Sequence, residues 1–387
     1  MHERLRVLVG SLAPGALPVV SDEPPAGTVL IDLGPDHPSH AGLIELQLWT
    51  VDRVITSAQV VVGAMHRGVE KLFEVRDYTQ ILMLADRHDW HAPFFGELAV
   101  ALTAEQLMGL TVPDRAVWLR TLLAEHTRIL SHCGFLTWVA RRGSSDPGLV
   151  RIREALRQQM SALTGNRIHP MVNRIGGLAA DADTGWLRAE ARVTAEVRTA
   201  ALRLLGLIES DPVAELTRGV AGLDPAIIAQ YGVSGPAARA SGVDLDLRCQ
   251  QPYLAYAELA DLIDPPRSVV GDAQARLTLL AQEMITSSRL VEACLERLAG
   301  IGGPVATKLG KIIRLPEGEG YGAVEAPLGI AGVYLSSRGE KTPWRLKLRT
   351  PSFNNIASLE SLLVGVEVDS LEAALASVGY VVGDVDK

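Results

Sequence analysis

The 387-residue sequence predicts an α+β fold, in which a large helical body lies between an N-terminal antiparallel β-sheet and a small C-terminal β-rich region. Segments that alternate apolar and polar residues occur near both ends, whereas the segments between them repeat apolar residues at helical spacing. The sequence contains no run of about 18 apolar residues, the length needed for a membrane-spanning helix. We expect an irregular leader over 1–26, a β-hairpin region over 27–62, the helical body over 63–305 and the β-rich region over 306–387, packed as one large domain.

The N-terminal sheet is predicted from two strands and a hairpin turn. Residues 27–33 (GTVLIDL) are typical of a strand that ends in a glycine-flanked loop, GPDHPSHAG. Residues 42–49 (GLIELQLW) alternate apolar and polar side chains, and a turn at Asp52 and Arg53 leads to the strand VITSAQVVV.

The helical body is predicted from about residue 66 onward. Pro113 is well placed to open a long helix, because proline is favoured in a first helical turn. Two more amphipathic segments cover about 184–208 and 269–299, and a glycine- and proline-rich stretch over 219–267 predicts no clear element. After a turn at Arg338 and Gly339, residues 344–349 alternate again and predict a C-terminal strand.

Composition excludes some classes of function. The formal net charge is −8, and Lys and Arg are scattered along the chain, so the basic patch of a nucleic-acid-binding protein is missing. Cys133, Cys249 and Cys294 lie far apart without a CxxC motif, which favours a reducing compartment and excludes both a disulfide framework and a self-contained iron–sulfur motif.

All nine histidines lie within the first 169 residues, and four of them form two HxxH pairs. His37 and His40 lie in GPDHPSHAG, and His88 and His91 lie in ADRHDWHAPF. Imidazoles beside carboxylates suit Zn, Mn or Fe, so one hypothesis is an independent di-metal hydrolase. A second is a metal-free site in which a loop histidine and a polar or aromatic group at a helix start bind a carbonyl-bearing ligand and supply protons to it. A third hypothesis is that the segment His37-Pro38-Ser39-His40 is only a turn.

Other histidine and cysteine positions favour the core. His126 and Cys133 share the apolar stripe of the helix that follows Pro113, where a hydrogen-bonded core histidine and a small buried thiol are ordinary. Cys294 is spaced with Val291, Leu295 and Leu298 and is interpreted in the same way.

Several stretches, taken in order, resemble one family. They are GPDHPSHAG, GAMHRGVEKLFEVRDYTQ, LAEHTRILSH, TGNRIHPMVNRIGGL, RASGVDLDLRCQQPY, YGAVEAPLGIAGVYLSSRGEKTPWRLKLRTPSFNN and the terminal GDVDK. From about residue 27 to the last residue they resemble the D subunit of respiratory complex I, the proton-pumping NADH:quinone oxidoreductase. The resemblance extends more distantly to the large subunit of nickel–iron hydrogenases, and so to the hydrogenase-large-subunit fold.

The resemblance to hydrogenases implies a lost metal cage. Those relatives hold nickel and iron with two CxxC pairs, and the matching positions here are Asp89 and Ala92, then Val381 and Asp384. Without thiolates the soft-ligand cage is absent, so hydrogenase activity is excluded and no metal site is expected. In complex I the corresponding cavity is the quinone headgroup pocket.

The resemblance also implies which residues approach the quinone. Family members use the histidine of a GPQHPSTHG-like loop and the tyrosine of RMDY, and these positions align with Ala41 and Trp90. Trp90 carries an indole N–H but no phenolic proton. The quinone-pocket candidates are therefore His37, His40, Asp89, Trp90 and His91. His40, Asp89, His88 and His91 are candidates to replace the usual proton donors, and the catalytic residue stays open.

Two matched positions imply contact with a partner's cluster. Arg87 and His169 correspond to family residues that lie against the terminal iron–sulfur cluster of the small subunit, where an arginine favours the reduced cluster and a histidine can couple its protonation to the electron. The family's acidic loop near the quinone channel is shortened here, with Asp146 as a candidate substitute, and the chain is also short between Gly300 and Glu317.

The resemblance implies a peripheral subunit on the cytoplasmic face of the membrane that binds no cofactor of its own. Its expected partners are the cluster-bearing small subunit, other peripheral-arm subunits and membrane-arm subunits, with NADH, FMN and iron–sulfur clusters on other chains and quinone as the substrate. One alternative is a divergent paralogue in a complex I-like assembly with altered or lost quinone chemistry. The other is the di-metal hydrolase, which near-stoichiometric metal in the pure chain would support.

Overall fold

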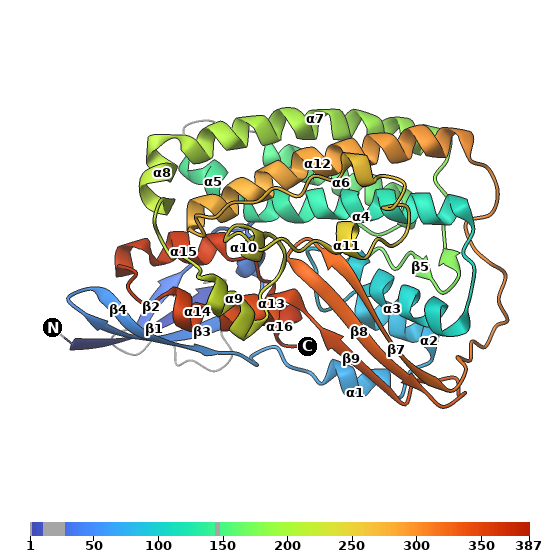
Figure 1. Cartoon of the computed structure of the whole chain (residues 1–387), viewed down its shortest axis with the longest axis horizontal. Coiled ribbons are helices and arrows are strands. Elements are labelled where there is room, and N and C mark those ends of the chain that lie inside the picture. Colours follow the sequence, from blue (N-terminus) through green and yellow to red (C-terminus); the bar gives the residue numbers. More distant parts are fainter. Residues whose placement is uncertain (1, 11–27, 144–147) are drawn as a thin grey trace.

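The computed structural model describes residues 2–10, 28–143 and 148–387. A stack of long helices forms one side of the molecule, and two β-sheets lie side by side beneath it, with short C-terminal helices between them (Figure 1). The predicted α+β class is confirmed.

The N-terminal sheet has four strands in the order β2-β1-β3-β4. The strands are β1 (His2–Gly10), β2 (Thr28–Ile31), β3 (Leu43–Val51) and β4 (Val54–Val61). The β1 strand runs antiparallel to β3 but parallel to β2, so the sheet is mixed rather than antiparallel. The prediction of an irregular leader was wrong for residues 2–10, where Val7 and Val9 are buried and Arg6 pairs with Glu45 across the strands.

The helical body contains both short and long helices. They are α1 (Val69–Phe73), α2 (Tyr78–Ala85), α3 (Pro93–Met108), α4 (Asp114–Phe135), α5 (Thr137–Arg142), α6 (Leu149–Thr164), α7 (Thr184–Glu209) and α12 (Ala273–Gly300). The α4, α6, α7 and α12 helices pack along one another as a bundle (Figure 1). The three long helices predicted from apolar spacing are confirmed, and Pro113 caps the first of them.

Short elements lie between α6 and α12, including the stretch over 219–267 for which the sequence predicts no clear element. They are the two-stranded β5 (Asn173–Arg174) and β6 (Gly177–Leu178), α8 (Asp211–Thr217), α9 (Pro225–Tyr231), α10 (Gly235–Arg239), α11 (Leu247–Gln250) and η2 (Ala260–Leu262). None of these helices exceeds seven residues, because proline, glycine and Asx caps recur along this stretch.

The C-terminal region is half sheet and half helix. The β7 (Gly318–Ala326), β8 (Gly329–Ser337) and β9 (Arg345–Arg349) strands form an antiparallel sheet that packs on α3. The chain then forms α13 (Pro351–Ala357), α14 (Leu359–Leu362), η3 (Val368–Ser370), α15 (Leu371–Ser377) and α16 (Val382–Val385). The prediction of a β-rich region therefore failed after residue 350, where Pro351 starts a helix and the run LEAALA favours another.

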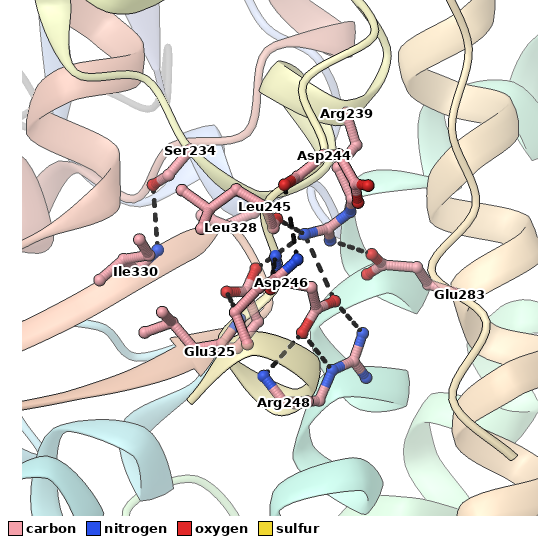
Figure 2. Close-up of polar contacts among 12 residues, drawn as sticks. Ser234, Arg239, Asp244, Leu245, Asp246, Arg248, Glu283, Glu325, Leu328 and Ile330 are labelled. Carbon is pink, nitrogen blue, oxygen red and sulfur yellow. Dashed lines mark hydrogen bonds and ion pairs between the residues drawn. The ribbon is translucent and has the colours of Figure 1, made fainter. Parts of the chain in front are cut away.

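A buried ionic network joins the helical bundle to the C-terminal sheet (Figure 2). Arg239 is ion-paired with Glu283 of α12, and its Nη1 lies 2.9 Å from Oε1 of Glu325 on β7. Arg248 makes a two-bond contact with Asp246, at 3.0 and 2.7 Å. All five side chains are almost fully buried, so each charge depends on its partners rather than on water.

Candidate functional site

The histidine loop between β2 and β3 turns through the 3-10 helix η1 (Pro38–His40). Nδ1 of His37 caps this helix by accepting a hydrogen bond from the Ser39 N–H at 3.2 Å, and the ring packs edge-on against Phe135 at 5.5 Å. Burial lowers the pKa of His37 to about 3, so its ring is neutral at physiological pH. His40 is half-buried, and its Nδ1 lies 3.2 Å from Oδ1 of Asp32.

A turn over residues 86–92 connects α2 to α3 and holds three of the candidate residues. Oδ1 of Asp89 accepts hydrogen bonds from the backbone N–H groups of His91 and Ala92, both at 3.0 Å. Burial and the nearby Asp384 raise the pKa of Asp89 to about 7, which lets this carboxyl bind and release a proton near neutral pH.

The C-terminal segment closes over this turn. Nδ1 of His88 lies 2.8 Å from Oδ1 of Asp384, although the two residues are 296 positions apart in the chain. Gly383 touches the turn so closely that an added Cβ would lie 2.3 Å from the Trp90 ring and 2.5 Å from the carbonyl oxygen of His88. A side chain at position 383 would therefore force the two segments apart.

The histidine loop and the 86–92 turn both contact the C-terminal end of α4, at Gly134. A Cβ on Gly134 would lie 2.9 Å from Nδ1 of His91 and 3.4 Å from Pro38. The His91 ring also packs against Phe135, which contacts His37 on its other side. The structure therefore brings His37 and His91 together with Asp89 and Trp90, while His40 turns toward Asp32 at the edge of this cluster.

The two HxxH pairs do not form a common metal cage. Among the described residues, no three His, Cys, Asp or Glu side chains are grouped so that they could hold a metal ion. His37 is turned toward Ser39, His40 toward Asp32 and His88 toward Asp384, so their rings do not converge on one point.

Arg87 and His169 meet around a buried carboxylate. Nη1 of Arg87 is ion-paired with Asp86, whose backbone oxygen lies 3.1 Å from Nδ1 of His169. The side chain of Asp86 is fully buried, whereas Arg87 and His169 are partly exposed. The pair therefore presents a partly exposed guanidinium and imidazole side by side, held by one carboxylate.

Two arginines of α6 belong to the site and were missed by the sequence analysis. Arg153 and Arg157 line a narrow cleft together with Trp90 and His91. Burial and these two arginines hold the pKa of His91 well below its usual value. The spacing of four residues places both arginines on one face of a helix, but the sequence does not show which element that face meets.

The core interpretations of the remaining residues are confirmed. His126 is fully buried, with Nδ1 2.8 Å from Oε1 of Glu190. Cys133 and Cys294 are buried free thiols, whereas Cys249 is exposed. Asp146, the candidate for the acidic loop, lies outside the described residues.

Comparisons with known proteins show the family of this chain. The family model described as respiratory-chain NADH dehydrogenase, 49 Kd subunit, matches residues 148–314 and 306–387. One relative, the first of the NADH-quinone oxidoreductase D subunits of Streptomyces coelicolor, is 46% identical over 364 residues, which cover 93% of this chain and 95% of that protein. The NADH-quinone oxidoreductase D subunit of Carboxydothermus hydrogenoformans is 35% identical over 362 residues, which cover 92% of this chain and 98% of that protein.

The chain belongs to the family of NADH-quinone oxidoreductase D subunits. It is thus one component of an enzyme complex, complex I. Within the described residues of this family member, no helix is long and apolar enough to cross a membrane.

Proposed function

We propose that this chain helps to form the quinone-reduction site of a proton-translocating NADH:quinone oxidoreductase, next to the terminal iron–sulfur cluster of a partner subunit. The observation that carries the proposal is the meeting of the histidine loop, the 86–92 turn and α16 at one place. Relatives of this chain are named as quinone oxidoreductase subunits, and the cluster of Asp89, Trp90 and His91 supplies polar groups that suit a carbonyl-bearing ring.

The proposed route of the electron passes the pair Arg87 and His169. A partly exposed cation favours the reduced form of a neighbouring cluster, and the His169 imidazole lies beside that cation. Asp86 fixes both side chains, so the pair offers a defined surface to a cluster-bearing small subunit. NADH, FMN and the iron–sulfur clusters would be held by other chains.

Asp89 is our candidate proton donor in this site. Its carboxyl is buried beside Trp90, and a pKa of about 7 allows it to be protonated before the reaction and ionised after it. His40 is the second candidate, because its half-buried position beside Asp32 at a loop allows a small movement to redirect the ring. We further propose that the chain lies on the cytoplasmic face of the cell membrane, docked on membrane-arm subunits.

The test is inhibitor-sensitive NADH:quinone activity of the purified assembled complex. We expect robust activity in the wild type and a loss of at least tenfold in the double variant His40→Ala and Asp89→Ala, since a positioned general acid contributes about that much or more. Asp261→Ala, at an exposed carboxylate on η2 outside the cluster, is the matched control. Robust activity that survives the double variant would show that the donor assignment is wrong.

A second candidate is a divergent paralogue whose pocket serves another acceptor or only transmits a conformational change. The observation that favours it is Trp90, whose indole N–H cannot give up a proton as a phenol does. An intact complex that oxidises NADH but reduces no quinone would select this candidate. Substituting Trp90→Tyr in that complex would then test whether the missing phenol is the cause.

A further inference from the structure

The narrow cleft between the 86–92 turn, α4 and α6 has an apolar lining and a cationic rim. Leu130, Met160 and Ile168 provide apolar contact, whereas Trp90, Arg153 and Arg157 provide N–H donors. The enclosed space of the cleft is only about 10 Å³, which admits one oxygen atom rather than a ring, so an oxygen-bearing aromatic ring would pack at the mouth of the cleft with its oxygen toward the donors.

Two of these donors are buried without an acceptor. Arg153 is 6% exposed, and its Nη1 donates to the backbone oxygen of Asp36 at 2.8 Å, but its Nε has no hydrogen-bond partner. The indole Nε1 of Trp90 is also buried without a partner. Buried donors of native proteins are nearly always satisfied, so these two N–H groups point to a missing acceptor in the cleft.

Positive charge exceeds negative charge around the cleft. Arg153 lies 3.3 Å from Oδ1 of Asp36, and Arg167 is ion-paired with Glu154 at 2.6 Å. Among the described residues, half-buried Arg157 has no carboxylate within ion-pairing distance. The guanidinium of Arg157 could therefore pair with an anionic ligand in the cleft.

We infer that Trp90, Arg153 and Arg157 form an oxyanion subsite that binds the ionised oxygen of a quinone-type ring in preference to the neutral carbonyl. This inference rests on the proposed function and deepens it. When a neutral quinone accepts one electron from the partner's cluster, it becomes a semiquinone radical anion, with no bond broken and no proton taken up. The subsite stabilises that anion, and it does so before any proton arrives.

The experiment compares an ionised quinone with a neutral one of the same shape. The assembled complex is titrated with a hydroxynaphthoquinone, which is an anion at neutral pH, and with its methyl ether, which is neutral. In Arg157→Gln we expect the anion to bind about tenfold more weakly, as for the loss of one charge-assisted hydrogen bond, and the ether to change less than twofold. Arg157→Lys keeps the charge and should recover part of the loss.

The matched control is Arg151→Gln on the same helix. Arg151 is exposed, pairs with Glu196 and lies outside the cleft, so both compounds should bind as they do to the wild type. Trp90→Phe keeps an aromatic ring but removes the N–H. It should weaken binding of the anion about threefold if the indole donates a hydrogen bond to it. Complex assembly and thermal stability of each variant are measured first, and a variant that fails to assemble is replaced by the lysine or phenylalanine substitution.

The outcomes separate this inference from the proposed function. If the wild type reduces quinone but Arg157→Gln weakens both compounds equally, or neither, the oxyanion subsite is refuted and the function stands. If the wild type reduces no quinone but binds the anion in an Arg157-dependent way, the function fails and the subsite stands. If neither compound binds to the wild type, the oxyanion subsite is refuted, and the proposed function is decided by the NADH:quinone activity alone.

Discussion

Replacing Glu97 by Gln is predicted to stabilise the protein at neutral pH but not in acid. Glu97 lies on α3 with its side chain fully buried. Its Oε2 accepts a hydrogen bond from the backbone N–H of Asn173 at 2.7 Å, while Oε1 has no partner. Burial first, and then the nearby Asp86, raise the pKa of Glu97 to about 8.

The size of the pH effect depends on whether Glu97 is protonated in the folded chain and in the unfolded chain. Below pH 4.5 both the folded and the unfolded chain keep the Glu97 proton, so this group adds no pH dependence. Between pH 4.5 and 8 the unfolded chain has released the proton and the folded chain has not, so the free energy of unfolding falls by about 1.4 kcal/mol per pH unit. The accumulated destabilisation at pH 7 is about 3 kcal/mol.

Gln removes this destabilisation because it is neutral at every pH and its Oε1 can still accept the Asn173 N–H. Urea unfolding of the full chain should therefore show little difference between Glu97→Gln and wild type at pH 4.5, and a more stable variant at pH 7 by up to about 3 kcal/mol. The matched control is Glu105→Gln on the same helix. Glu105 binds Arg120 through two bonds, at 2.8 and 2.9 Å, so its loss should destabilise the chain at pH 7 by about 3 kcal/mol.

The pH dependence is the critical result. An equal difference between Glu97→Gln and wild type at both pH values would mean that the substitution acts through packing. A less stable variant at pH 7 would mean that the folded protein holds Glu97 ionised, and the argument from burial would be wrong.

Two other predictions concern the buried network and the thiols. Arg239→Met should destabilise the chain by about 3–5 kcal/mol in urea unfolding, because Glu283 and Glu325 lose their shared cation, and a change below about 1 kcal/mol would contradict the importance of this ion pair. Among the three thiols, only Cys249 should react rapidly with an alkylating reagent in the folded chain, as followed by mass spectrometry, because burial shields Cys133 and raises its pKa to about 12. Rapid labelling of Cys133 in the folded chain would show that the end of α4 opens.

The sequence predicted the helical body better than the sheets because long amphipathic helices carry a strong local signal. Residues 184–208 and 269–299 match α7 and α12 closely. The strand over residues 2–10 was missed, although Leu5, Val7 and Val9 alternate with Arg4, Arg6 and Leu8, because its main partner β3 is about forty residues away in the sequence. Local pattern does not reveal such pairings.

The candidate site was predicted in part, for a related reason. His37, Asp89, Trp90 and His91 were singled out from short motifs and do lie together, but Arg153 and Arg157 look like ordinary polar positions of an amphipathic helix. Only the tertiary packing of α6 against the 86–92 turn gives them a place in the site. The buried network around Arg239 was missed likewise, because its members come from α10, α12, β7 and the segment before α11.

The C-terminal segment docks on the candidate site through carboxylates. Asp384 binds His88, and the Asp386 carboxylate accepts hydrogen bonds from the backbone N–H groups of Gly63 at 2.7 Å and Met65 at 2.8 Å. The resemblance to hydrogenases implies a thiolate ligand at position 384, where this chain has a carboxylate that ties the C-terminal segment to the 86–92 turn. These contacts join the C-terminal segment both to the 86–92 turn and to the chain that follows β4, so three segments that are distant in the sequence are held together here.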